Sequence, residues 1–221
     1  LHDELDGVTL AEDGTVEIGP IKWFHHVTTS PVIQATVPTL GDACDTPGGP
    51  QLRVSGTIGG NVCTAATSGD SASTLFAYGA LLDVASVRGT RTIPIEEWYA
   101  GPGRSHKERD ELLVKIRIPR SHYEGFTGYY FKYGKRNALE ITTMGCCCLV
   151  KLAADKSTIE DIRLAFGVAG PTPMRALAAE DAVRGLPVAE AAEKIGELAA
   201  GCTNPRDSWR ASKEFRLQLI K

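Results

Sequence analysis

The sequence predicts an α+β fold, and three features of its 221 residues support this prediction. Apolar and polar residues alternate over 7–19 and again over 111–118, as in half-buried β-strands. Further strand-like stretches follow one another over 127–169. From 177 to 220, apolar residues recur at three- and four-residue steps, which is typical of amphipathic helices. We therefore expect a mixed first part, then a sheet, then a helical tail.

The composition is that of a globular protein and excludes several other classes. Hydrophobic residues make up 43% and charged residues 23%, which rules out a disordered tail, a collagen-like repeat and a coiled coil. The net charge of −3 provides no basic field for nucleic acid or acidic lipid. No apolar run has membrane-spanning length, and the first residues do not form a signal-peptide pattern. We expect a cytoplasmic protein that binds neither nucleic acid nor membranes.

Residues 1–120 are expected to form the first subdomain. Pro31 suits the first turn of a helix capped by Ser30. The backbone N–H groups of a first turn have no partner within the helix, so a proline there costs the helix no hydrogen bond. Pro94 places its strand at a sheet edge, since proline cannot donate a hydrogen bond to a neighbouring strand. The expected elements are a hairpin over 7–10 and 15–19, helical structure over 23–43, a short helix capped by Ser73, strands over 81–86 and 91–95, and a strand over 111–118.

Residues 121–221 are expected to form a second subdomain, after a polar boundary at 120–125. Its three strands are long, and a short turn at 154–157 joins two of them, which is typical of an antiparallel meander. Helices follow and end at glycine or proline. The expected elements are strands over 127–135, 142–153 and 159–169, then helices over 177–183, 188–198 and 209–220, the last capped by Asp207 or Ser208.

The segment from 46 to 70 holds six glycines among hydroxyl and amide side chains. This composition predicts neither a flexible linker nor a stable helix, but a backbone that approaches a ligand closely. Paired glycines leave backbone N–H groups free to bind a polar ligand. The glycine patterns of Rossmann and P-loop cradles and the G-x-S-x-G elbow are absent. A binding loop and a glycine-rich turn required only by sheet geometry fit the sequence equally well.

Six cysteines occur, and three of them are consecutive. On a strand, Cys146, Cys147 and Cys148 point to alternate faces, so they cannot all bind one metal ion. Metal-ligand spacings are absent, and we expect buried reduced thiols, with cluster ligation by the triplet as the alternative. We also find no catalytic pair of carboxylates and no nucleophile and base set, and expect His25 and His26 on a helix surface.

Several short motifs, in order along the whole chain, resemble one protein family. Thr57-Ile-Gly-Gly-Asn61, followed by Asp70, resembles the flavin-contacting loop in the FAD-binding domain of molybdenum hydroxylases. That family includes xanthine dehydrogenases and carbon monoxide dehydrogenases, and the chain resembles in particular the separate FAD subunit of bacterial xanthine dehydrogenases. The other motifs are Gly49-Pro-Gln-Leu-Arg53, Arg88-Gly-Thr-Arg91, Gly101-Pro-Gly103, Asp110-Glu-Leu-Leu113, Phe131-Lys132, Arg163-Leu-Ala-Phe-Gly167 and Arg210-Ala-Ser-Lys-Glu-Phe-Arg216.

The resemblance implies a FAD-binding subdomain of the vanillyl-alcohol-oxidase-like type in 1–120 and a C-terminal α+β subdomain in 121–221. In the family, an earlier small subdomain carries a glycine-rich loop that holds the FAD pyrophosphate. This sequence is expected to start after that loop, so that half of the cofactor site lies outside it. A second departure is Val54, where the family often has Asn, so that one local hydrogen bond of the pattern is lost.

The resemblance also implies contacts between individual residues and FAD. Asp70 would accept a hydrogen bond from a cofactor hydroxyl, with a helix N-cap as its alternative role. Leu113 would supply an apolar contact and Lys132 a basic group, with a core position and a solvated charge as the respective alternatives. The implied set is Gly48 beside the ring, Thr57, Ile58, Gly59, Gly60 and Asn61 around the flavin, Thr64 as a further hydroxyl, and Asp70, Leu113 and Lys132.

The function implied by the resemblance is electron transfer. In the family, purine oxidation takes place at a molybdopterin centre on one partner subunit, electrons pass through [2Fe–2S] clusters on another, and FAD in this chain passes them to NAD. The alternatives are the flavin subunit of a related aldehyde, nicotinate or carbon monoxide dehydrogenase, and a truncated docking module without flavin. A visible spectrum with flavin bands distinguishes the last of these from the others.

Overall fold

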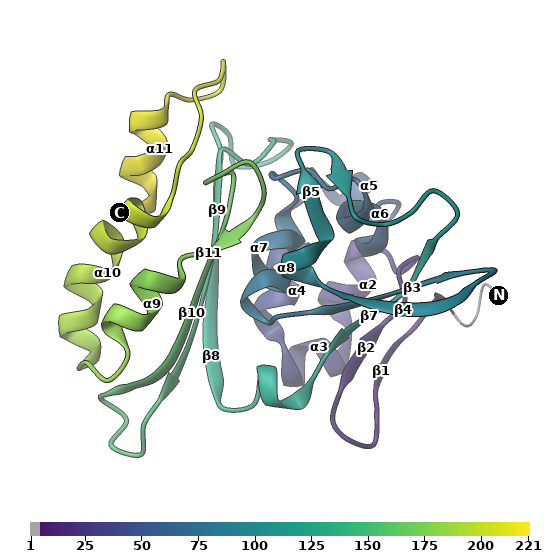
Figure 1. Cartoon of the computed structure of the whole chain (residues 1–221), viewed down its shortest axis with the longest axis horizontal. Helices are drawn as coiled ribbons and strands as arrows, with labels where there is room; N and C mark the ends of the chain where they lie inside the picture. Colours follow the sequence, from purple (N-terminus) through teal and green to yellow (C-terminus); the bar gives the residue numbers. More distant parts are fainter. Residues whose placement is uncertain (1–4) are drawn as a thin grey trace.

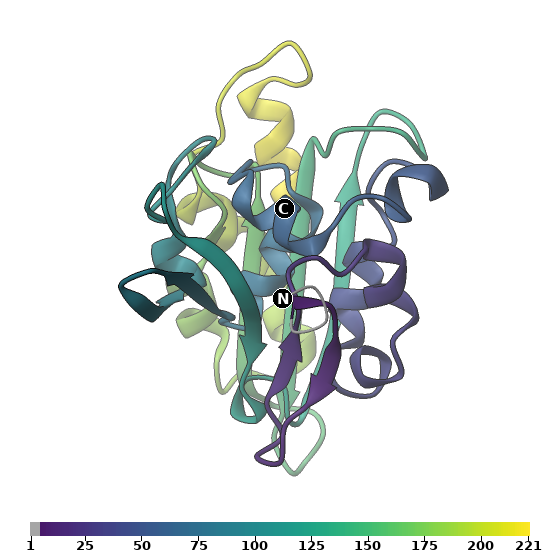
Figure 2. The ribbon, with the colours of Figure 1, turned by 90° about the vertical axis from the view of Figure 1, so that its right-hand side faces the viewer.

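Two β-sheets and two groups of helices alternate as four layers in the computed structural model, which describes residues 5–221 (Figures 1 and 2). At the right of Figure 1 is the first sheet, and at the left are the C-terminal helices. The second sheet separates those helices from the helices of the first half, which lie between the two sheets. The predicted mixture of helix and sheet is confirmed.

The first sheet has five antiparallel strands. Val16 and Ile18 of the N-terminal hairpin, and Ile116 opposite, are fully buried, which explains the alternation seen in the sequence. Pro94 lies on the edge strand, as predicted. In spatial order the strands are β1 (Val8–Leu10), β2 (Val16–Ile18), β7 (Leu112–Ile118), β3 (Leu81–Ser86) and β4 (Gly89–Pro94).

The helices between the sheets differ from the prediction in three ways. The single helical pattern over 23–43 is divided into α2 (Phe24–Thr29), α3 (Pro31–Thr36) and α4 (Pro38–Cys44), because each proline starts a new helix. Ser30 occupies the N-cap position of α3, but its side chain makes no capping hydrogen bond. The predicted cap at Ser73 is wrong: α7 (Asp70–Ala77) begins three residues earlier, and all its residues are buried between the two sheets.

The second sheet contains the three predicted strands and one more. They are antiparallel, and a short strand extends the sheet beyond the predicted meander. The order is β11 (Met174–Arg175), β10 (Ile159–Gly167), β9 (Met144–Leu152) and β8 (Phe126–Tyr133). Elsewhere, α8 (Ile95–Trp98) and the small hairpin β5 (Tyr99–Gly101) and β6 (Arg104–Ser105) precede β7, and a 3₁₀ turn at Arg120–His122 leads into β8.

Helices α9 (Leu177–Val183), α10 (Val188–Cys202) and α11 (Lys213–Ile220) cover the outer face of the second sheet (Figure 1). The predicted start of the last helix was wrong. Its N-cap is Ser212, whose hydroxyl accepts a hydrogen bond from the Phe215 N–H at 3.2 Å. The preceding residues, including Trp209, form an irregular connection instead.

The cysteine triplet lies on β9 with alternating orientation, as predicted. Cys147 belongs to the core around α7, whereas Cys146 and Cys148 pack toward the C-terminal helices. All six cysteines are free, and burial raises the pKa of the Cys148 thiol to about 11. Within residues 5–221, no group of side chains is arranged to hold a metal ion, and no helix is long and apolar enough to span a bilayer.

Candidate functional site

The glycine-rich segment folds into two short helices, contrary to the prediction that it is not helical. They are α5 (Pro50–Arg53) and α6 (Ile58–Cys63). Thr57 is the N-cap of helix α6, and its hydroxyl accepts a hydrogen bond from the Gly60 N–H at 3.0 Å. Burial of Ile58 and Val62 anchors the helix in the core. This capping and burial offset the low helix propensity of the two glycines.

The backbone N–H groups at the start of α6 already have acceptors within the chain. Ile58 donates to the Lys22 carbonyl at 3.0 Å, and Gly59 donates to the Pro20 carbonyl at 2.9 Å. The Asn61 N–H donates to the carbonyl of Thr57 at 3.0 Å. The first two of these hydrogen bonds hold α6 against the segment that precedes α2. What the segment can offer to a ligand is the exposed surface of Gly60 and the side-chain NH2 of Asn61, whose Oδ1 already accepts a hydrogen bond from the Ser71 hydroxyl at 2.7 Å.

The two adjacent glycines have different environments. A Cβ on Gly59 would lie 2.5 Å from both the Cβ and the carbonyl oxygen of Pro20, so Gly59 is required by packing. Gly60 is exposed, and a Cβ there would meet only the Thr57 hydroxyl, at 2.9 Å. Only Gly60 therefore leaves an open approach to the backbone.

Asp70, at the first position of α7, is the centre of a buried polar cluster. Its carboxylate accepts hydrogen bonds from the Tyr130 hydroxyl at 3.2 Å, from the Thr142 hydroxyl, and from the Lys132 ammonium at 3.0 Å. The Asp70 and Lys132 side chains are only 8% and 13% exposed. The N-cap of α7 is Gly69, so Asp70 does not cap the helix, although its charge is favourable beside the helix N-terminus. The cluster ties α7 to β8 and to the loop after it.

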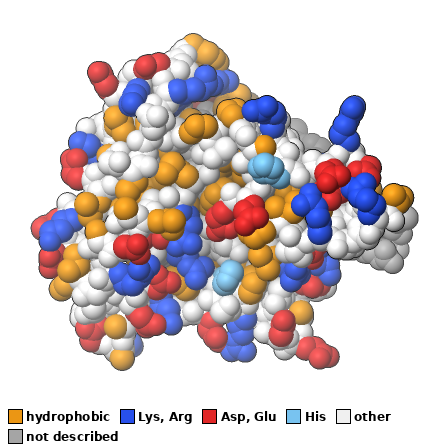
Figure 3. Space-filling view, in the orientation of Figure 1, with side chains coloured by type: hydrophobic (Ala, Val, Ile, Leu, Met, Phe, Trp, Pro, Cys, Tyr) orange, Lys and Arg blue, Asp and Glu red, His pale blue; other side chains and the backbone are white. Residues whose placement is uncertain are grey.

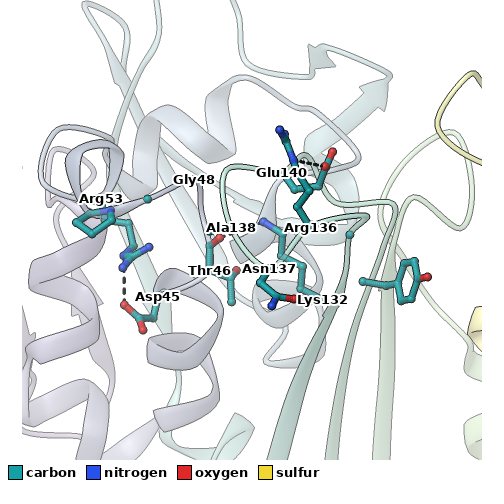
Figure 4. Close-up of a pocket in the computed structure, with 13 residues that line it drawn as sticks. Asp45, Thr46, Gly48, Arg53, Lys132, Arg136, Asn137, Ala138 and Glu140 are labelled. Atoms are coloured by element: carbon teal, nitrogen blue, oxygen red, sulfur yellow. Dashed lines mark hydrogen bonds and ion pairs between the residues drawn. The ribbon is translucent and has the colours of Figure 1, made fainter.

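A groove of about 680 Å³ lies beside this cluster, a size typical of small-molecule sites (Figure 4). Thr46, Gly48 and Arg53 border one side of it. Lys132 and the β8–β9 loop, residues 134–143, border the other. The Lys132 ammonium reaches across to the carbonyl of Thr46 at 3.1 Å. One positive charge is thereby fixed in the groove, whose opposite wall combines the backbone of Gly48 with the ion pair between Arg53 and Asp45 at 3.2 Å.

A smaller hollow of about 350 Å³ lies on the other side of the β8–β9 loop. Gly48, Asn61 and Asp70 line it together with Leu139 and Thr142. Gly48 has a φ of +53°, a conformation that suits glycine, and its carbonyl accepts a hydrogen bond from the Leu139 N–H at 3.1 Å. The loop thus rests on Gly48 and separates the two hollows.

The structure gathers part of the predicted set around these hollows. Gly48, Asn61, Asp70 and Lys132 line one or both of them. Leu113 is a buried core residue of β7, and Thr64 is exposed and donates its hydroxyl to the Gly60 carbonyl. Neither of these two lines the hollows, and neither do the predicted residues Thr57, Ile58, Gly59 and Gly60.

Five residues of the site were not predicted from the sequence: Thr46, Tyr130 and Thr142, which complete the cluster, and the loop residues Arg136 and Asn137. Tyr130 occurs in a strand pattern where its burial is expected, but its hydroxyl partner comes from a helix 60 residues earlier. Only the aromatic richness of β8 gave a signal that this strand is unusual.

The sequence matches two family models that together span nearly the whole chain. Residues 3–121 match the FAD binding domain in molybdopterin dehydrogenase, and residues 129–221 match the CO dehydrogenase flavoprotein C-terminal domain. With the fold and the groove described above, these matches define a flavin-binding chain of a redox complex. The chain belongs to the family of FAD-binding subunits of molybdopterin dehydrogenases.

Individual relatives agree with this family. The chain is 42% identical to a xanthine dehydrogenase FAD-binding subunit from Escherichia coli O157:H7, over 99% of this chain and 74% of that protein. It is 31% identical to the nicotinate dehydrogenase FAD-subunit of Eubacterium barkeri, over 80% of this chain and 60% of that one. A solved structure of carbon monoxide dehydrogenase from Hydrogenophaga pseudoflava superimposes with a TM-score of 0.91 at 27% identity, over 99% of this chain and 75% of that one.

The residues around the groove fit a flavin cofactor. Backbone at Gly48, which borders both hollows, permits close approach of a flat ring, and Lys132 supplies a polar group in the groove while Asn61 supplies one in the smaller hollow. A fixed ammonium suits a ring system whose reduced form gains negative charge. The Asp70 carboxylate, in contrast, already has three donors within the chain.

Proposed function

We propose that this chain is the flavin subunit of a molybdenum hydroxylase that oxidises purines such as xanthine or hypoxanthine, and that it passes the electrons to NAD in the cytoplasm. The observation that carries this proposal is the 42% identity to a xanthine dehydrogenase FAD-binding subunit, against 31% to a nicotinate dehydrogenase subunit. Identity at this level over 99% of the chain favours the same substrate class.

In this proposal the chain positions FAD and does not act on the purine. Bound FAD exchanges electrons singly or in pairs, and so connects iron–sulfur clusters to a two-electron acceptor. Gly48 and Gly60 allow the ring to approach, Asn61 offers its amide, and Lys132 provides a positive charge. Asp70, Tyr130 and Thr142 act through Lys132 and the β8–β9 loop by holding both in place. The other residues that the resemblance implies as contacts support the site from the surrounding structure; they are Thr57, Ile58, Gly59, Thr64 and Leu113.

The proposed partners are a molybdopterin-binding subunit, where the purine is oxidised, and a subunit that carries [2Fe–2S] clusters. No nucleophile and base set lines the described groove, which is consistent with substrate oxidation elsewhere.

The test compares two electron acceptors in the assembled complex. A complex depleted of FAD, with xanthine as substrate, is expected to reduce an artificial dye that accepts electrons from the iron–sulfur clusters at near the normal rate. Reduction of NAD is expected to disappear and to return when FAD is added. Equal loss of both activities would contradict the assignment of this chain to the exit of electrons.

A docking module without flavin is the competing function, and one observation favours it. The first N–H groups of α6 and the Asp70 carboxylate all have partners within the chain, as expected of a segment shaped only for packing. The visible spectrum of the purified assembly separates the two: bands at about 370 and 450 nm support the flavin subunit, and their absence supports the docking module.

A further inference from the structure

The connection between α10 and α11, residues 203–212, projects from the top of the molecule in both ribbon views (Figures 1 and 2). We call it the Trp209 loop, because Trp209 is its most prominent side chain. Trp209 is 79% exposed, which is unusual for the largest apolar side chain. At the top of the space-filling view, hydrophobic and basic side chains lie next to each other (Figure 3). The loop overlaps the start of one of the motifs noted in the sequence, 210–216. The proposed function assigns no role to that motif.

The Trp209 loop is held in one shape by a buried arginine. Arg216 is 2% exposed, and its guanidinium donates to the Ser208 hydroxyl at 2.9 Å, to the Thr143 carbonyl at 3.2 Å and to the Arg206 carbonyl. At the start of the loop, the Asn204 N–H donates to the carbonyl of Ala169, in the connection between β10 and β11, at 2.9 Å. The loop is therefore preorganised, so it would lose little conformational entropy when a partner binds.

Basic side chains gather around Trp209. The Arg210 guanidinium lies over the indole ring at 4.3 Å, and the Lys135 ammonium lies 5.7 Å from it. Arg206 and Lys213 are exposed on the same connection and at the start of α11. None of these four forms an ion pair with a carboxylate in residues 5–221, and the Arg210 Nε is buried without a hydrogen-bond acceptor there.

The positive charges are close enough to affect one another. Burial, followed by the charges of Arg206 and Arg210, lowers the pKa of the Arg216 guanidinium. Two exposed carboxylates, Asp207 and Glu214, lie in the same segment, and neither forms an ion pair within residues 5–221. Against these two, the four cations leave a local excess of positive charge on a chain whose net charge is −3.

We propose that the Trp209 loop, together with Lys135, is a docking surface for a partner polypeptide that presents carboxylates around an apolar pocket. Trp and Arg dominate the binding energy of protein interfaces when they are held rigidly and lose their water on binding. Carboxylates would neutralise the unpaired cations, and the pocket would receive the indole. The inference rests on the proposed function, in that the partner is one of the other subunits of the complex.

The test measures association of this chain with the purified partner subunits by sedimentation or surface binding, without turnover. The test variants are Trp209→Ala and Arg206→Glu, which alter exposed groups that no buried contact requires. The controls are Leu177→Ala, which truncates a side chain of 58% exposure on α9, and Arg109→Glu, which makes the same charge change in an exposed loop before β7. Melting temperatures of all four verify that each variant is folded.

Each test variant is expected to weaken association by about thirtyfold, the loss typical of an interface hot spot, and both controls by less than about twofold. Wild-type binding should also weaken with added salt. Trp209 emission, identified by its loss in Trp209→Phe, should shift to shorter wavelength when the partner binds.

Association of Trp209→Ala and Arg206→Glu at wild-type affinity would overturn the docking surface and leave the proposed function standing. The same emission shift with single-stranded DNA or with anionic lipid vesicles, at an affinity equal to that for the subunits, would also overturn it in favour of a general polyanion site. A wild-type chain that binds neither subunit would contradict both the docking surface and the proposed partners.

Discussion

Replacement of Asp70 by alanine removes the acceptor at the centre of the cluster that joins α7, β8 and the β8–β9 loop. Three donors lose their acceptor at once: two hydroxyl groups, on Tyr130 and Thr142, and the ammonium of Lys132. Tyr130 is 6% exposed and Thr142 is 4% exposed, so water cannot easily replace the carboxylate.

The loss is expected to be large because the ion pair is buried. Removing one partner of a buried pair typically costs about 3–5 kcal/mol, and we expect about 3 kcal/mol here, since Lys132 keeps the Thr46 carbonyl as an acceptor. For a chain of this length, that corresponds to a fall in melting temperature of roughly 6–12 °C. Asp70→Asn, which retains an oxygen for the hydroxyl groups, should lose about half as much free energy of unfolding.

The assay is denaturant unfolding of the wild type and both variants, followed by FAD titration of each under native conditions. A matched control is Asp83→Asn, which breaks a partly buried ion pair with Arg117 in the first sheet, away from the groove. It should reduce stability without changing FAD affinity, whereas both Asp70 variants should reduce both. A loss below about 1 kcal/mol for Asp70→Ala would refute the reasoning, because it would show that the cluster contributes no more than an exposed ion pair.

Two further predictions concern other parts of the chain. Gly59→Val should unfold at a lower denaturant concentration than the wild type, because the new side chain would collide with Pro20. Gly60→Val should keep most of the stability of the wild type but contain less FAD. Equal stability of the two variants, or full FAD content in Gly60→Val, would contradict this distinction between the two glycines. Hydrogen bonds from the Arg91 guanidinium lower the pKa of Glu111 from 4.5 to about 2, so its contribution to stability is present above its ordinary pKa and is lost as pH falls from about 4.5 to 2. The stability difference between the wild type and Glu111→Gln should shrink over that pH range, and a difference independent of pH would disprove the coupling.

Strand periodicity allowed most of the second sheet to be predicted from the sequence. Buried positions alternate along most of β9, and the last four residues of β10 are all buried, so both strands are rich in apolar residues; 142–153 and 159–169 were located to within two residues. The first residue of each helix was harder to predict, because it depends on which nearby oxygen atom accepts hydrogen bonds from the first backbone N–H groups. Ser212 rather than Asp207 or Ser208 caps α11, although the Asp207 carboxylate accepts the Lys213 N–H at 2.7 Å.

The candidate site was predictable where it depends on glycine and was not predictable where it depends on contacts distant in sequence. Gly48 and Asn61 lie in a segment whose composition already indicated unusual backbone. The partners of Asp70 come from 60 to 72 residues later in the chain, and nothing in their local sequence indicates that they share one carboxylate. The α6 helix was missed because its stability comes from tertiary burial of Ile58 and Val62 and not from local propensity.

The central claim, that FAD binds in the groove beside Lys132, is tested most directly by FAD affinity in the purified assembly. Lys132→Met is compared with Lys115→Met, which removes an ammonium paired with Glu17 in the first sheet. We predict about one FAD per chain and flavin absorbance at about 450 nm in the wild type and in Lys115→Met, with FAD affinity at least about tenfold weaker in Lys132→Met. Equal FAD affinity in the two variants, or a wild-type assembly without flavin absorbance, would contradict the claim.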